Sequence, residues 1–159
     1  MPHLRLQVPN EWMDDGFVEE TGFDAGKLLD HLVEVLCGLE MPEVNDDGSP
    51  AGSGPESGMV PLINRKNLKH GLMPVFHSGV GGDRSKGFLH LTFAAGNDNS
   101  GRTAEVRRNA AEVLGDVIDE WVGDLPGLGS VTVHVEDIDR DRGYTTTASR
   151  KTRREAGSG

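Results

Sequence analysis

The first eight residues, Met1-Pro2-His3-Leu4-Arg5-Leu6-Gln7-Val8, carry the pattern from which the fold prediction starts. From His3 onward polar and apolar residues alternate, and this is typical of a strand with one buried side. Aminopeptidases remove an initiator Met before a small residue, which would leave Pro2 with a free secondary amine. A strand starting at residue 2 would hold that amine in place, since chain ends otherwise fray. The alternative is that Met-Pro is simply a common way for a protein to begin.

The composition limits the class of protein. A chain of 159 residues fits one domain, predicted here over residues 1–138, with residues 139–159 as a largely disordered basic tail. The net charge is −10; the tail holds six Lys/Arg against three acids, so the remainder carries −13. An acidic body argues against nucleic acid as the main partner. No apolar run is long enough for a membrane span, the first residues lack the basic and then apolar pattern of a signal peptide, and Cys37 is the single cysteine. We therefore expect a cytoplasmic protein.

The rest of the chain alternates between strand and helix patterns. A connection is predicted over 9–23, followed by a helix capped by Asp24 with apolar residues at helical spacing up to Leu39. Residues 41–58, rich in Gly, Pro, Ser and acids, are interpreted as a flexible insertion. The later elements are predicted as a strand within 72–80 that Pro74 confines to an edge or a bulge, a strand over 86–95, a helix capped by Thr103 or Ser100 and running to Trp121, and a strand over 131–138.

This order forms two β-α-β halves, beginning at residues 2 and 87. Each helix is long enough for a crossover, so each half should contain a parallel strand pair. The predicted fold is α+β, a four-stranded mixed sheet with two helices on one face. The opposite face is of mixed polarity and is expected to pack on another copy of the chain. Its predicted residues are His3, Arg5, Gln7, Phe88, His90, Thr92, Thr132, His134 and Glu136.

Three stretches together resemble the 5-carboxymethyl-2-hydroxymuconate isomerases of the tautomerase superfamily. They are Met1-Pro2-His3, the strand Phe88-Leu-His-Leu-Thr-Phe93 leading to Ser100-Gly-Arg-Thr103, and Val131-Thr-Val-His-Val-Glu-Asp-Ile138. The resemblance covers about two thirds of the chain. It implies a homotrimer of double β-α-β subunits that uses no metal and no cofactor. It also implies an isomerase in which the N-terminal proline moves a proton on an unsaturated 2-hydroxy or 2-oxo dicarboxylic acid.

The resemblance assigns catalysis to Pro2 as acid and base. A base for this role needs a pKa near neutrality, and burial and nearby cations both lower the pKa of an amine. A dicarboxylate also requires cations, preferably arginines with bidentate geometry. Arg102 matches the arginine of the family's Gly-Arg-Ser turn, at a helix N-terminus that favours anions. The family's second-strand arginine has no clear counterpart here: Arg65, Lys66 and Lys69 compete, with Arg65 slightly ahead.

Other functions stay open at this stage. His3, His90 and His134 share one predicted face and could hold zinc, but no pair has the spacing of metal ligands. A trimeric scaffold or binding protein that retained the fold and lost the chemistry is an alternative, favoured by the acidic insertion and the extra tail. A third possibility is a related enzyme that dehalogenates or hydrates unsaturated acids with the same proline.

Overall fold

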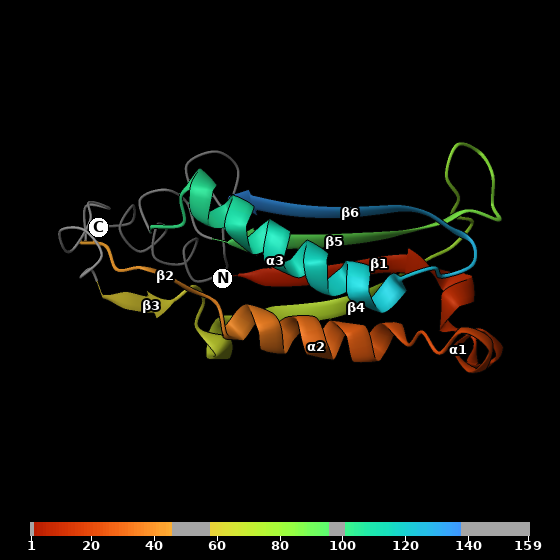
Figure 1. Ribbon diagram of the computed structural model, residues 1–159, viewed down its shortest axis with the longest axis horizontal. Coiled ribbons are helices and arrows are strands. Elements are labelled where there is room, and N and C mark those ends of the chain that lie inside the picture. The colour runs from red at the N-terminus through yellow and green to blue at the C-terminus, as the bar shows by residue number, and fades with distance from the viewer. Residues whose placement is uncertain (1, 46–57, 96–100, 138–159) are drawn as a thin grey trace, which may run out of the picture.

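The computed structural model describes residues 2–45, 58–95 and 101–137. A four-stranded sheet forms one layer, and α2 and α3 lie side by side across one of its faces (Figure 1). In chain order the elements are β1 (His3–Pro9), the 3-10 helix η1 (Asn10–Met13), α1 (Asp15–Thr21), α2 (Ala25–Cys37), β2 (Glu40–Pro42), β3 (Met59–Pro61), the 3-10 helix η3 (Arg65–Asn67), β4 (Lys69–Val75), β5 (Gly87–Ala95), α3 (Ala104–Val122) and β6 (Leu128–Asp137).

The sheet has the strand order β4-β1-β5-β6. β1 is parallel to β4, with His3 opposite Lys69, and β5 is parallel to β6. The two halves meet at β1 and β5, which are antiparallel and place His3 opposite Ala94. Each half therefore encloses one crossover helix between parallel strands. The predicted double β-α-β architecture with a mixed sheet is confirmed.

The core lies between the sheet and the two long helices. Leu4, Leu6 and Val8 of β1 are buried, as their alternation predicted, and Leu89, Leu91 and Phe93 of β5 pack beside them. Asp24 caps α2 as expected, because its Oδ1 accepts a hydrogen bond from the Lys27 amide at 3.1 Å. The helix then buries its apolar stripe: Ala25, Leu28, Leu29, Leu32, Val33 and Leu36.

The second long helix, α3, has Thr103 as its N-cap, one of the two predicted cap residues. The Thr103 hydroxyl accepts a hydrogen bond from the Val106 amide at 3.3 Å. The buried side of the helix consists of Ala110, Leu114, Ile118 and Val122, spaced four residues apart. On the outer side, the Trp121 ring stacks on His31 of α2 with ring centroids 5.6 Å apart. The two crossover helices are thus joined at their surface as well as through the core.

The predicted connection over 9–23 was wrong in part, since it contains η1 and the seven-residue helix α1. Aromatic packing accounts for this helix. The Trp12 ring stacks on Phe17 at a centroid distance of 5.5 Å, and Phe23 contacts both rings edge-on. These rings hold a segment whose Asp15-Gly16 pair indicated a turn.

The second strand was placed too late in the chain. It occupies Lys69–Val75 as β4 rather than lying within 72–80, because its first residue pairs with His3 at the start of β1. Pro74 is accommodated as expected, since β4 is an edge strand of the described sheet. At the other end, His77 has a φ of 54° and ends the extended segment.

The predicted insertion over 41–58 also has ordered flanks. β2 and β3 pair antiparallel, with Met41 opposite Val60, and the Met41 side chain is buried. The ladder continues through a hydrogen bond of 2.9 Å from the Leu62 amide to the Leu39 carbonyl. Residues 46–57, like the predicted tail over 139–159, lie outside the described residues. Within the described ranges, no helix has the length and apolarity needed to cross a membrane.

Candidate functional site

Pro2 lies immediately before β1, a central strand of the sheet. The residue is partly buried, and its carbonyl accepts a hydrogen bond of 3.0 Å from the Lys69 amide. β1 is paired on both sides, with β4 and with β5. Figure 1 shows this end of β1 beside the N-terminal end of α3 and the C-terminal end of α2. The pairing of β1 therefore fixes the position of residue 2. This residue lies at the end of the sheet where α2 ends and α3 begins.

Arg102 belongs to the turn that leads into α3. Gly101, just before it, has a φ of 84°, a conformation that glycine adopts without strain. The Arg102 Nε–H donates a hydrogen bond of 2.8 Å to the Leu62 carbonyl, so the guanidinium is anchored to the segment that follows β3. Burial lowers the pKa of this guanidinium from its ordinary value, but an arginine remains charged. A partly desolvated, oriented cation is suited to binding a carboxylate.

Lys69 lies next to the N-terminal segment on the edge strand β4. A shallow groove of about 190 Å³ runs between β1 and β4 on the face of the sheet away from the helices. Arg5 and Lys69 contribute cations to this groove, and no acidic residue lines it within the ranges that the structure describes. The residues that line it are His3, Leu4, Arg5, Lys69, His70, Gly71 and Met73. This groove can therefore accept a negatively charged group close to Pro2.

Arg65, the slightly preferred second cation in the sequence, has a different environment. Its two terminal nitrogens bind both carboxylate oxygens of Glu34 on α2, at 2.9 and 2.8 Å. Both side chains are more than half exposed. The hydrogen bond and the charge of Arg65 lower the pKa of the Glu34 carboxyl. The guanidinium thus already has a bidentate carboxylate partner within its own chain.

The structure therefore groups the predicted residues unevenly. Pro2 and Lys69 are joined through the backbone, and α3, which begins two residues after Arg102, starts at the same end of the sheet (Figure 1). Arg65 is directed to the surface of α2 by its ion pair. The Glu34–Arg65 pair could not be predicted from the sequence, because residues 31 positions apart are brought together only by the fold.

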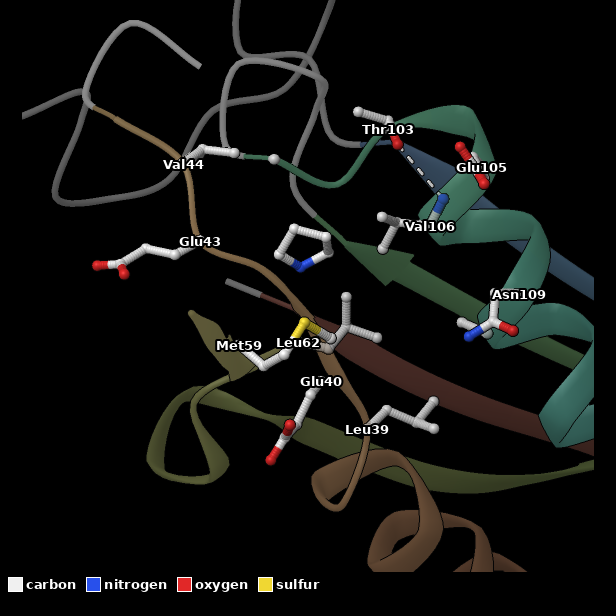
Figure 2. Close-up of a pocket in the computed structure, with 13 residues that line it drawn as sticks. Leu39, Glu40, Glu43, Val44, Met59, Leu62, Thr103, Glu105, Val106 and Asn109 are labelled. Carbon is white, nitrogen blue, oxygen red and sulfur yellow. Dashed lines mark hydrogen bonds between the residues drawn. The ribbon is translucent and has the colours of Figure 1, made fainter. Parts of the chain in front are cut away.

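A larger pocket was not predicted at all. It has a volume of about 510 Å³ and lies between the β2–β3 hairpin and the first turns of α3 (Figure 2). Neither Pro2 nor Arg102 lines it, although Gly101 and Thr103 do. The available signal in the sequence is the apolar segment Met59-Val60-Pro61-Leu62, which directly follows the predicted insertion. The pocket depends on pairing this segment with residues 40–42.

The histidines of the open sheet face do not form a metal site in the described part of the chain. His3 is opposite Ala94, His90 is opposite Gln7, and His134 is opposite Thr92, so they occupy separate positions along the strands. Among the described residues, no group of three potential ligands is close enough to hold a metal ion.

Comparison with solved structures identifies the fold. A 5-carboxymethyl-2-hydroxymuconate delta-isomerase matches with a TM-score of 0.60 and 17% identity, over 96% of this chain and 92% of that one. A 5-carboxymethyl-2-hydroxymuconate isomerase from Deinococcus radiodurans R1 matches with a TM-score of 0.53 and 18% identity, over 91% and 88%. The protein Pt0534, inactivated by 2-oxo-3-pentynoate, matches with a TM-score of 0.53 and 14% identity, over 91% and 92%.

At these low identities, the structural likeness shows a shared fold alone. No protein-family model and no curated protein matches the chain in sequence.

Proposed function

We propose that this chain, which has the fold of the 5-carboxymethyl-2-hydroxymuconate isomerases, is a cofactor-independent tautomerase. Its substrate would be an unsaturated 2-hydroxy or 2-oxo dicarboxylic acid, and Pro2, freed by removal of Met1, would be the acid and base. The observation that carries the proposal is the position of Pro2. The residue directly precedes a strand paired on both sides, at the end of the sheet where α3 begins, two residues after Arg102.

The proposed reaction needs one group that both accepts and returns a proton. The neutral amine of Pro2 takes the proton of the 2-hydroxyl group, and the dienol electrons shift along the conjugated carbon atoms. The resulting ammonium then protonates a carbon atom, which leaves a 2-oxo product and regenerates the amine. Proton transfer by a positioned group contributes about 10²–10⁴-fold to a rate. The strand pairing of β1 supplies this positioning, because it fixes the backbone that carries the amine.

Two cations are proposed to bind the substrate carboxylates. Arg102 is anchored through its Nε–H, which leaves its terminal nitrogens as the atoms to meet a carboxylate. Lys69 is proposed as the second cation, because its backbone contacts Pro2 and its groove lacks acidic residues. Arg65 is less suited to this role, since a substrate would have to displace Glu34 from a bidentate pair. Cations near Pro2 would also lower the pKa of its amine.

A homotrimer is part of the proposal. The open face of the sheet carries partly exposed His3, Gln7, Phe88 and His90, a mixture suited to contact with another copy. The edge strand β4 exposes Met73, and Phe76 just beyond it is 72% exposed. Covering these side chains would remove apolar surface from water. Sedimentation of the untagged protein should give a mass three times that of the chain. A mass of one chain would contradict the proposed trimer.

Chemical labelling of the untagged protein tests the proposed site. Its intact mass should first show that Met1 is absent, since a retained Met places Pro2 in an amide that cannot accept a proton. The reagent 2-oxo-3-pentynoate, which inactivates Pt0534, should then add one equivalent through attack of the Pro2 amine on the alkyne. Fragmentation should locate the adduct at residue 2. An adduct only on other side chains would contradict the role of Pro2.

The same protein tests the other possible functions. A turnover assay with 2-hydroxymuconate distinguishes an isomerase from a scaffold that retained the fold. A 3-haloacrylate, with halide release as the measurement, addresses a dehalogenating relative. If Pro2 is labelled and only the haloacrylate is turned over, Pro2 stays the proposed reactive residue, but the proposed reaction becomes dehalogenation and not tautomerisation.

A further inference from the structure

The pocket beside the β2–β3 hairpin has the size of a small-molecule site. Its volume of about 510 Å³ lies within the roughly 300–1,000 Å³ of typical ligand pockets. Pro2, Arg102 and Lys69 do not line it. The pocket is thus lined by residues other than those of the proposed function.

The interior of the pocket is apolar. Leu62 and Ala110 are buried at its base, and Leu39 and Val106 flank them. Met59 at the mouth remains 55% exposed. Figure 2 shows Met59, Leu62 and Val106 gathered around the hollow, with Leu39 below. An apolar body entering here would cover side chains that the fold leaves uncovered.

The charged residues of the pocket are all acidic. Glu40 and Glu43 come from the hairpin segment, and Glu105 comes from the first turn of α3. No Lys, Arg or His is among the residues that line the pocket in the described part of the chain. The carboxylates lie around the rim and extend outward in Figure 2, so they act on a group at the mouth and not on the apolar base.

The carboxylates of this rim determine which charge a ligand can carry at the mouth of the pocket. A helix N-terminus ordinarily favours an anion, but Thr103 already accepts the Val106 amide, and Glu105 is in the same turn. Arg102, the neighbouring cation, directs its Nε–H to the Leu62 carbonyl and does not line the pocket. An anion at the mouth would meet three carboxylates, whereas a cation would be attracted by them.

We infer that this pocket binds an amine with an apolar body, the body lying on Leu62 and Val106 and the ammonium group at the glutamate rim. The preference is opposite in charge to the dicarboxylate of the proposed function. A substrate of that kind would therefore bind to the pocket less well than an amine, because the same carboxylates repel it.

Three probes with one apolar body and different charges test the inference by calorimetry on the full chain. They are 4-phenylbutylamine, 4-phenylbutan-1-ol and 4-phenylbutyrate. Because exposed charge pairs contribute modestly, the amine should bind about fivefold more tightly than the alcohol at low salt. The carboxylate should bind most weakly, and added salt should reduce the differences. Equal affinity for the three probes, preference for the carboxylate, or no binding of any probe would overturn the inference.

Two sets of variants locate the effect. Glu40→Gln with Glu105→Gln should reduce the preference for the amine over the alcohol, while the matched pair Glu112→Gln with Glu120→Gln, exposed on α3 outside the pocket, should leave the preference intact. Asn109→Trp, at an exposed position that lines the pocket, should weaken all three probes. An amine preference of undiminished size in the first pair, or affinities unchanged by Asn109→Trp, would assign the binding elsewhere and overturn the inference.

Discussion

The Lys69 amide donates a hydrogen bond to the Pro2 carbonyl at 3.0 Å. This bond extends the parallel β1–β4 pairing by one residue beyond His3. The amine of residue 2 would therefore stand on a backbone held by the ladder, and not at a fraying end. The same bond brings Lys69, a cation of the edge strand, next to the proposed catalytic group.

Substitution of Pro2 should remove catalysis and leave the fold intact. Met1 should still be removed before Ala, so Pro2→Ala retains an amine at the same position but changes it from secondary to primary. We expect a loss in kcat of about 10²-fold, at the low end for a proton-transfer group. Pro2→Leu should retain Met1 and move the terminal amine by one residue, which should abolish turnover. Ketonisation of 2-hydroxymuconate, followed by its ultraviolet absorbance, measures both. Full activity of Pro2→Leu would show that the amine of residue 2 is not the base.

Arg102→Gln should impair substrate binding. If its guanidinium holds a carboxylate, loss of a charge-assisted pair should raise KM by about 10–100-fold. The substitution also affects the hydrogen bond to Leu62, worth about 1 kcal/mol of unfolding free energy. Urea unfolding must therefore accompany the kinetics. Arg108→Gln, at an exposed arginine of α3, is the matched control and should leave KM unchanged. Equal effects of the two variants on KM would indicate a general loss of positive charge.

Lys69 and Arg65 can be distinguished by paired substitutions. Lys69→Met should raise KM about fivefold, as expected for an exposed cation that contacts a carboxylate. Arg65→Met should leave KM unchanged, because its guanidinium already binds Glu34. The two variants remove the same charge from nearby positions, so the overall field changes equally. A larger increase in KM from Arg65→Met than from Lys69→Met would make Arg65 the second cation that binds the substrate.

The Glu34–Arg65 pair should make a small, pH-dependent contribution to stability. Arg65 lowers the pKa of Glu34 below its ordinary 4.5. The stabilisation is therefore complete above that value and is lost as the pH falls through the lower pKa of the folded state. Arg65→Met should reduce Tm slightly at pH 7 and have no such effect once Glu34 is protonated. Lys66→Met, at the neighbouring exposed lysine, should show no matching pH dependence. A reduction of Tm that persists with Glu34 protonated would exclude the ion pair as its cause.

The sequence predicted those parts of the fold that local patterns determine. The alternation in β1 and the stripes of α2 and α3 repeat at the period of the element, so neighbouring residues suffice to reveal them. The Asp24 and Thr103 caps are also local. Helix α1 was missed because rings at Trp12 and Phe23, outside the helix, stabilise it. The bounds of β4 were missed because pairing with β1 sets them.

The candidate site shows the same division. Pro2 and Arg102 could be proposed from short motifs, whereas the engagement of Arg65 by Glu34 and the closeness of Lys69 to Pro2 join distant parts of the chain. The hairpin pocket was beyond prediction for a further reason. It arises where β2 and β3 pair across a segment that composition marks as flexible.

Gly87 should be the most sensitive glycine at the far end of the sheet. A Cβ atom built there would lie 2.7 Å from Pro9 Cγ and 2.8 Å from Trp12 Cζ2, closer than carbon atoms approach. Gly87→Ala should therefore push Trp12 from its stack with Phe17 and lower the unfolding free energy by about 1–3 kcal/mol. Urea unfolding with tryptophan fluorescence would measure this. Gly16→Ala, in α1 with nothing within 4 Å of its Cβ, is the matched control and should stabilise by about 0.4–1 kcal/mol. Because Gly87 is distant from Pro2 along the sheet, Gly87→Ala should retain its kcat wherever it is folded. A loss of kcat without a loss of stability would show that the Trp12 cluster and the proposed site are coupled.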